Sequence, residues 1–163
     1  MKKVAIVMGS KNDASVVNGA YEALKKFGVP TEVRVLSAHR TPKEACDFAS
    51  NARANDFGVI ICAAGKAAHL AGVMAAHTSL PIIGLPIKSS FEDGLDSLLS
   101  TVQMPSGVPV ATVGVNAGEN AGLLAIQMLA IENPMLTKKL DEFKQVMAEK
   151  ILNDDKQIMS EFN

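Results

Sequence analysis

The chain has 163 residues, 48% hydrophobic and 20% charged, so it can bury one sizeable core but is short for two. Its 16 basic and 17 acidic residues are spread along the chain and give a formal net charge of -1, which leaves no basic stripe for nucleic acid. The chain has no tryptophan and one tyrosine, so few aromatic rings are available for stacking bases. We expect a single domain over residues 1–163 without a nucleic-acid partner.

The cysteine content and the hydropathy pattern indicate the cellular compartment of the protein. Cys46 and Cys62 are too few and too far apart for a disulfide framework or a zinc site, so no metal is expected. The apolar run that ends at Met8 is too short for an export signal and is typical of a β-strand. No apolar stretch is long enough to span a bilayer. These features predict a reduced, cytoplasmic protein with no membrane partner.

Five short runs rich in β-branched residues alternate with longer helical patterns. They are Val4–Met8, Glu32–Leu36, Val59–Ala63, Ile82–Pro86 and Val110–Val115. The first, third and fourth runs are apolar throughout, which is typical of parallel strands covered by helices on both faces. The pattern predicts an α/β fold with three layers, a doubly wound parallel sheet of five core strands in the flavodoxin-like order 2-1-3-4-5. Such a fold collects ligands at the carboxyl ends of its strands.

Residues 134–163 are predicted to form an extra C-terminal helix. Ala117–Ile131 has a helical pattern, and Asn133-Pro134 ends it. Apolar residues then recur at helical spacing, with many charged residues opposite: Leu136, Leu140, Phe143, Met147 and Ile151. A five-stranded sandwich does not need this helix, which could wrap its own domain. We expect it to pack on a neighbouring subunit.

The first candidate site motif, Gly9-Ser10-Lys11-Asn12-Asp13, follows the first strand. Gly9 lets the backbone approach a ligand closely, Ser10 can donate to a phosphate oxygen, and a helix N-terminus favours an anion. Asp13 would be free to accept hydrogen bonds from ribose hydroxyls. A simpler interpretation, equally weighted, is that Asn12 or Asp13 caps the helix.

The second motif, Ser37-Ala38-His39-Arg40-Thr41-Pro42, follows the second strand. Thr41–Glu44 supplies a hydroxyl cap, a proline at the first helical position and a capping-box glutamate. Arg40 would stand outside the positive end of the helix dipole, which is unfavourable unless an anion binds there. His39 beside it suits proton transfer near pH 7, although a lone loop histidine is often surface decoration. The combination favours a functional interpretation.

The third motif runs from Ala63 to Gly72 after the third strand. Its small side chains leave room for a flat heterocycle, and its exposed peptide N–H groups could hold a carboxylate. Close packing of helix on strand, with His69 as a core residue, explains the same pattern at least as well. All three motifs fall at the same edge of the predicted sheet, which is the main argument for one site.

Together and in this order, the three motifs, with Asp96-Ser97-Leu98 and Gln103-Met104-Pro105, resemble the N5-carboxyaminoimidazole ribonucleotide mutase family over nearly the whole chain. The resemblance implies an enzyme of purine biosynthesis that moves a carboxylate from N5 to C4 of an aminoimidazole ribonucleotide. In that reaction the N5 carboxylate leaves as carbon dioxide, is trapped beside the ring and recarboxylates C4. The chemistry needs no cofactor and no metal. The family also implies a homo-oligomer, an octamer.

The resemblance also implies a role for each candidate residue. His39 would be the catalytic acid/base that moves the C4 proton. Five residues would bind substrate, with Ser10 and Arg40 near the phosphate and Asp13 on the ribose: Gly9, Ser10, Asp13, Ser37 and Arg40. Four would border the carbon dioxide and carboxylate pocket: Gly65, Lys66, Ala67 and His69. This chain departs from the family pattern at Asn12, Lys66 and Ala71, where serine, glycine and proline are common.

Two other functions are alternatives to the mutase. A class II carboxylase, which uses free carbon dioxide, resembles Ser-Ala-His-Lys at the second motif, whereas Arg40 stands here and favours the mutase. A non-enzymatic flavodoxin-like binding module, such as a phosphoacceptor domain, needs an acidic cluster after the first strand and an aspartate ending the third. The chain has Met8-Gly9-Ser10 and Cys62-Ala63-Ala64-Gly65 there, and it lacks the aromatic residues that would hold a flavin.

Overall fold

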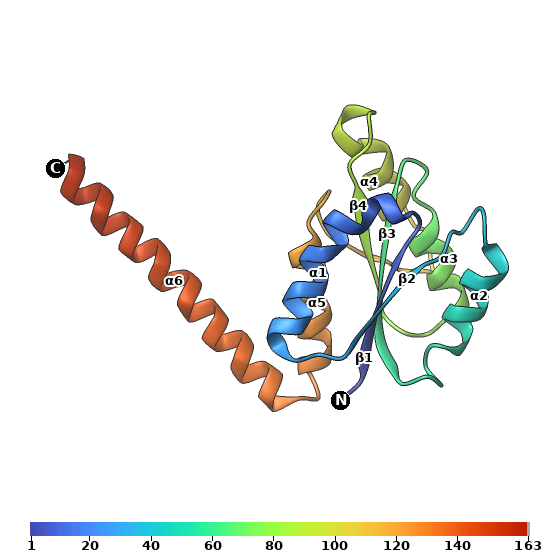
Figure 1. The fold of residues 1–163 in the computed structure, drawn as a ribbon, viewed down its shortest axis with the longest axis horizontal. Coiled ribbons are helices and arrows are strands. Elements are labelled where there is room, and N and C mark those ends of the chain that lie inside the picture. The colour runs from blue at the N-terminus through green and yellow to red at the C-terminus, as the bar shows by residue number, and fades with distance from the viewer. Residues whose placement is uncertain (163) are drawn as a thin grey trace.

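The structure is a computed structural model that describes residues 1–162. Its centre is a five-stranded parallel sheet in the order β2-β1-β3-β4-β5, as predicted (Figure 1). The strands are β1 (Lys3–Met8), β2 (Thr31–Val35), β3 (Phe57–Gly65), β4 (Ile82–Ile87) and β5 (Ala111–Thr112). β1, β3 and β4 are almost wholly buried, which explains why their sequences are apolar throughout.

Helices cover both faces of the sheet and complete the three layers (Figure 1). α1 (Ala14–Phe27) and α5 (Gly118–Ala130) pack on one face, while α2 (Pro42–Asn51) and α3 (Leu70–His77) pack on the other. Side chains alternate along β1, so that Val4 and Ile6 join the first of these cores and Ala5 and Val7 join the second. α4 (Leu95–Val102) lies against β4 and β5, following a short 3-10 turn, η2 (Glu92–Gly94).

The fifth strand is shorter than the predicted run Val110–Val115. Only Ala111 and Thr112 are in register with β4, although the Val113 amide still donates to the Gly84 carbonyl at 3.0 Å. The chain then leaves the sheet, and Asn116 takes a positive φ of 57° before α5 begins. An edge strand needs only one neighbour, so this early departure breaks few ladder hydrogen bonds. The prediction of a strand was correct, and its length was wrong.

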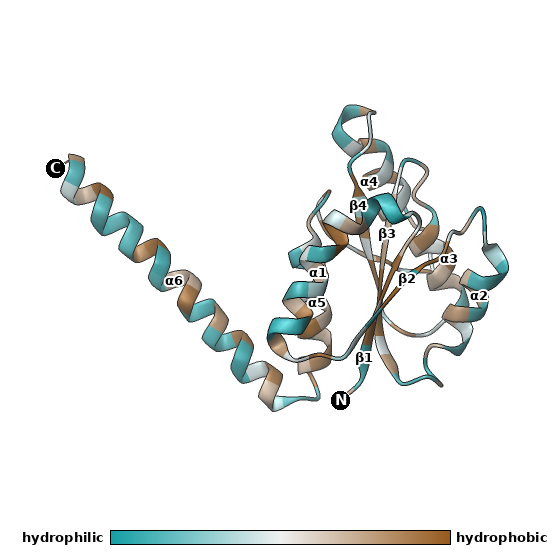
Figure 2. Cartoon of the chain, in the orientation of Figure 1, coloured by the Kyte–Doolittle hydropathy of each residue, from teal (hydrophilic) through white to brown (hydrophobic). Residues whose placement is uncertain are grey.

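α6 (Pro134–Phe162) extends away from the body of the molecule (Figure 1). Its 29 residues correspond to a rod about 44 Å long. Leu136 and Leu140 are its buried residues, and Phe143 packs edge-on against Phe27 with ring centroids 5.8 Å apart. Beyond this turn the apolar residues face solvent, as the brown patches along the helix in Figure 2 indicate: Val146, Met147, Ile151, Leu152, Ile158, Met159 and Phe162.

Within the described residues, no helix is both long enough and apolar enough to cross a membrane. The predicted extension over 134–163 begins where α6 begins, and its last residue, Asn163, lies outside the described residues.

Candidate functional site

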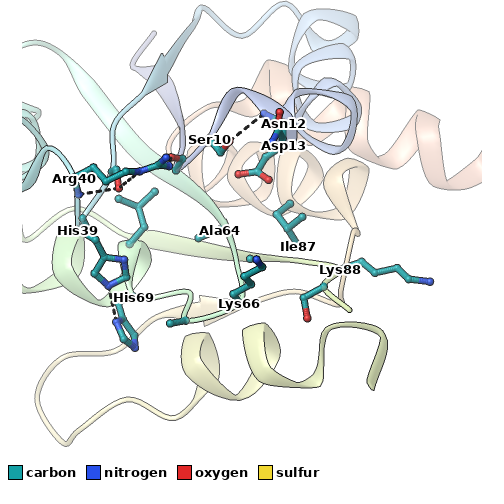
Figure 3. Close-up of a pocket in the computed structure, with 17 residues that line it drawn as sticks. Ser10, Asn12, Asp13, His39, Arg40, Ala64, Lys66, His69, Ile87 and Lys88 are labelled. Atoms are coloured by element: carbon teal, nitrogen blue, oxygen red, sulfur yellow. Dashed lines mark hydrogen bonds between the residues drawn. The ribbon is translucent and has the colours of Figure 1, made fainter. Parts of the chain in front are cut away.

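A cavity of about 700 Å³ opens at the carboxyl edge of the sheet (Figure 3). It is lined by the loops that follow β1, β2, β3 and β4. All ten residues predicted from the sequence to act in a site lie in its wall: Gly9, Ser10, Asp13, Ser37, His39, Arg40, Gly65, Lys66, Ala67 and His69. Segments up to 80 residues apart in the chain, from Gly9 to Ser89, therefore meet here, because parallel strands present their carboxyl ends at one edge.

The loop after β1 contributes Ser10 and Asp13. A 3-10 turn, η1 (Lys11–Asp13), follows Ser10, whose hydroxyl oxygen accepts the Asn12 amide at 3.3 Å. The side chain of Asp13 makes no capping hydrogen bond to α1, so its carboxylate stays available at the cavity. Burial raises the pKa of this carboxyl, while the Ser10 amide and Arg40 oppose the rise. The simpler interpretation, that Asn12 or Asp13 caps the helix, is wrong: Ser10 caps η1 instead.

The loop after β2 begins with a turn that the sequence did not predict. Thr41 precedes α2 and Pro42 occupies the first helical position, as expected, but no side-chain capping bond forms. The Thr41 hydroxyl accepts the Ser37 amide at 2.9 Å and can donate to the Ser37 carbonyl at 3.2 Å. The predicted capping box with Glu44 is therefore wrong. Thr41 closes a turn within its own loop, a competition that short hydroxyl side chains often win.

Arg40 links the loops that follow β1 and β2. One guanidinium N–H donates to the Gly9 carbonyl oxygen at 2.8 Å, and the Arg40 backbone N–H donates to the Ser37 hydroxyl at 3.1 Å. The guanidinium has five N–H donors, so it keeps others for a ligand. The cation beside the start of α2 is thus partly satisfied by a protein carbonyl, and it remains exposed at the cavity.

The loop after β3 carries Gly65, Lys66, Ala67 and His69. His69 is exposed at the start of α3, so its interpretation as a core residue is wrong. Close packing does account for the glycine that ends this motif. A Cβ on Gly72 would lie 3.0 Å from the sulfur of Met104. The small residues of the third motif therefore have two roles. Gly65 and Ala67 line the cavity, and Gly72 allows α3 to pack closely against Met104.

His39 and His69 form a pair across the cavity mouth. Their ring nitrogens, Nε2 of His39 and Nδ1 of His69, are 2.9 Å apart, and the rings meet edge to face with centroids 5.0 Å apart (Figure 3). At this distance the two rings share a hydrogen bond, and which ring is the donor depends on the tautomers. The contact orients the imidazole of His39. It also places the His69 ring where it could accept a proton from His39.

The cavity is also lined by Ile87, Lys88 and Ser89, at the end of β4. The sequence predicts a polar loop over Lys88-Ser89-Ser90 that could border the pocket, but its spacing is not diagnostic. The Ser89 hydroxyl donates to the Asp96 carboxylate at 2.6 Å, which ties this loop to the first turn of α4. The Asp96-Ser97 segment therefore holds one wall of the cavity without lining it. The available signal was position alone, since these residues follow a buried strand at the site edge.

The charges at the cavity suit an anionic ligand. Arg40, Lys66 and Lys88 line it, with Lys88 paired to Asp93 at 2.8 Å, and Asp13 is the acidic residue in its wall. Among residues 1–162, no group of three or more histidine, cysteine, aspartate or glutamate side chains is arranged to hold a metal ion. The arrangement could bind an anion, accept hydrogen bonds from hydroxyl groups through Asp13, and transfer a proton through the histidine pair.

Comparison with known sequences identifies relatives along most of the chain. A family model described as AIR carboxylase matches residues 3–150. The chain is 48% identical over 152 residues to the N5-carboxyaminoimidazole ribonucleotide mutase of Thermotoga maritima, covering 93% of this chain and 89% of that protein. It is 51% identical over 153 residues to the protein of that name from Saccharolobus solfataricus, covering 94% and 97%. A chloroplastic phosphoribosylaminoimidazole carboxylase of Vigna aconitifolia is 48% identical over 151 residues, which are 27% of that longer protein.

Solved structures give the same fold. The crystal structure of Treponema denticola PurE has a TM-score of 0.87 and 28% sequence identity, covering 94% of this chain and 96% of that one. A 3-dehydroquinate dehydratase-like protein from Bifidobacterium longum has a TM-score of 0.51 and 16% identity, covering 80% and 99%, and shares the fold alone.

Proposed function

Because the chain belongs to the AIR carboxylase family, we propose that it is an N5-carboxyaminoimidazole ribonucleotide mutase of purine biosynthesis. It moves a carboxylate from N5 to C4 of the imidazole ring by releasing carbon dioxide and recapturing it. The observation that carries the proposal is the single cavity that gathers all ten predicted residues, with His39 and His69 in contact at 2.9 Å.

The ribonucleotide binds with its phosphate at the loops after β1 and β2. Ser10 and Arg40 supply donors there, and Gly9 and Ser37 hold the Arg40 side chain and backbone in position through bonds of 2.8 and 3.1 Å. Asp13 accepts hydrogen bonds from the ribose hydroxyls. Its freedom from helix capping supports this role, and a ligand that donates to the carboxylate offsets its burial.

Chemistry at the ring needs a proton acceptor and a dry pocket. N5 gains a proton when its carboxylate leaves, and C4 loses one when the carboxylate arrives, so the net reaction moves one proton. His39 gives the proton to N5 and takes the one from C4, with His69 as the neighbour that shares it. Gly65 and Ala67 have small side chains, so carbon dioxide can stay beside the ring between release and recapture. No step in this scheme calls for a metal or an organic cofactor.

Direct carboxylation with free carbon dioxide is not favoured. The relatives from Thermotoga maritima and Saccharolobus solfataricus, which match this chain in length, carry the mutase name, whereas the Vigna aconitifolia carboxylase matches over only 27% of its length. Arg40, which bonds to the Gly9 carbonyl, also stands where the class II pattern has lysine, and this difference favours the mutase.

The test supplies the purified chain with the N5-carboxyamino ribonucleotide and follows formation of the C4-carboxylated product. We expect wild-type turnover, and we expect His39→Asn to lose it while its substrate affinity stays within about tenfold. His77→Asn is the matched control, because His77 is exposed and does not line the cavity. Efficient use of the decarboxylated ribonucleotide at low bicarbonate, with none of the carboxyamino compound, would instead identify a carboxylase.

We also propose that the protein is a cytoplasmic homo-oligomer, an octamer, in which α6 packs on a neighbouring subunit. The apolar residues of α6 beyond Phe143 are exposed, Ile151 by 66% and Phe162 by 76%, and a second copy would cover them. Light scattering should give eight times 17.2 kDa. Ile151→Glu should reduce that mass, whereas Lys150→Glu on the same turn should not; a wild-type monomer would refute the assembly.

A further inference from the structure

Lys66 stands in a backbone conformation that costs free energy. Its φ is +56°, in the left-handed region where a Cβ crowds the following carbonyl. The other non-glycine residues with positive φ lie outside the cavity wall. Gly65 before it is in register with Ile87 in the sheet, and the Lys66 carbonyl accepts the Ser100 hydroxyl at 3.4 Å. A strained residue that the surrounding structure holds in a ligand cavity points to a function.

Lys66 is also a cation without a counter-ion. No ion pair found among residues 1–162 includes it, whereas Lys88 is paired with Asp93 and Arg40 bonds to the Gly9 carbonyl. In the view of Figure 3 its side chain lies between the histidine pair and Lys88. A positive charge held at the wall of a cavity and left unneutralised by the protein attracts an anionic group of a ligand.

The position of Lys66 indicates that its ligand is the substrate carboxylate rather than the phosphate. It follows β3, the strand whose loop also carries His69, and His69 contacts His39. The ring atom that loses its proton must lie beside His39, so a carboxylate on that atom falls near the β3 loop. The phosphate is assigned to the loops after β1 and β2, with Arg40.

We infer that Lys66 binds the substrate carboxylate and so discriminates carboxylated from decarboxylated ribonucleotide. This inference rests on the proposed function. The ammonium group pairs with the carboxylate while the group is bound at N5 and again when it is bound at C4. The ion pair is absent while the group is neutral carbon dioxide, so Lys66 acts on the substrate and the product. Glycine is common at this position in the family that the sequence resembles. The carboxylate contact of Lys66 is therefore an addition that this chain makes to the shared site.

The experiment compares two ligands that differ only in the carboxylate. Titration calorimetry at low ionic strength measures the affinity of wild type and Lys66→Met for the C4-carboxylated and the decarboxylated aminoimidazole ribonucleotides. Because the lysine is exposed, we expect roughly a tenfold loss for the carboxylated ligand. The decarboxylated ligand should change by less than about twofold, and added salt should shrink the difference.

Two further substitutions separate charge from backbone strain. Lys66→Arg should keep most of the discrimination, and Lys66→Gly should lose it as Lys66→Met does, even though glycine relieves the strain and raises the melting temperature. Lys11→Met is the control, since Lys11 is an exposed lysine near the same edge that does not line the cavity. It should leave the ratio of the two affinities unchanged.

Two results would overturn the inference. An equal loss for both ligands would mean that Lys66 binds the phosphate or holds the loop, and no loss for either would mean that it binds neither. Turnover of the carboxyamino ribonucleotide by the wild-type chain decides the proposed function separately. A chain that turns over and yet shows no carboxylate-dependent loss refutes the role of Lys66 alone.

Discussion

Gly118 should be a position where one methyl group damages both the fold and the site. A Cβ added there would lie 2.2 Å from the Val16 carbonyl oxygen and 3.4 Å from the Ala20 nitrogen. Both atoms belong to the backbone of α1, which starts directly after Asp13. Gly118→Ala would therefore push α1 away from α5 at the end of the helix that presents the proposed ribose-binding carboxylate.

The size of the effect follows from that distance. A Cβ contact under 3.0 Å to a backbone atom forces a shift, so the helices must separate by about 1 Å. Overpacking of this kind costs about 1–3 kcal/mol, and alanine returns less than about 1 kcal/mol of helix propensity in a first turn. We expect a net loss near 2 kcal/mol, or a melting temperature lower by roughly 4–8 °C.

Thermal denaturation followed by circular dichroism, together with steady-state kinetics, measures both effects. A displacement of about 1 Å at Asp13 should lower kcat/KM by roughly 10- to 100-fold. Gly114→Ala is the matched control, because its new Cβ would meet nothing closer than the Ala117 Cβ at 3.6 Å. Unchanged stability and kinetics in Gly118→Ala, or equal losses in Gly114→Ala, would refute the reasoning.

Three further predictions concern single groups. Burial raises the pKa of the Asp13 carboxyl above 3.8, so the folded chain binds that proton more tightly than the unfolded chain, and stability falls as pH rises through the raised pKa. Asp13→Asn should accordingly be more stable than wild type at pH 7, with the gap closing in denaturant titrations below pH 3.8, yet bind ribonucleotide more weakly. Arg40→Lys loses the 2.8 Å bond to the Gly9 carbonyl and the planar fork, so calorimetry should give about 2 kcal/mol weaker binding of the phosphorylated ligand and little change for the nucleoside. Burial raises the pKa of the Cys62 thiol, so a thiol reagent at pH 8 should modify Cys46 alone in the native chain and both after denaturation; two reactive native thiols would contradict this.

The fold could largely be predicted because buried parallel strands have a distinctive sequence pattern. β1, β3 and β4 are covered on both faces, and a continuous apolar run is what such strands require. β5 was overestimated because Val110–Val115 has the same local character, while its ladder with β4 depends on where the chain must turn into α5. A turn of that kind is fixed by packing between distant segments, which local sequence does not contain.

The convergence of the three motifs could be predicted from the sequence, whereas their contacts could not. Motif position at strand ends was enough to predict that the ten residues lie at one cavity, because the sheet order fixes which loops are neighbours. Two hydrogen bonds were not predicted. Thr41 bonds to Ser37 instead of capping α2, and Arg40 bonds to the Gly9 carbonyl, which only the folded loops bring close to it. The polar loop that contains Ser89 could be expected to border the pocket, but nothing in its sequence predicts the bond from Ser89 to Asp96.

The histidine pair depends on the whole sheet, although it consists of two exposed side chains. His39 follows β2 and His69 comes after β3, and these strands are separated by β1, so their backbones are about 10 Å apart. The rings bridge this gap, and their nitrogens meet at 2.9 Å. A shift of either strand by one register position would move its histidine by about 3.4 Å along the strand and break the contact. The parallel ladders on both sides of β1 therefore set the distance between the two groups that the proposed proton transfer requires.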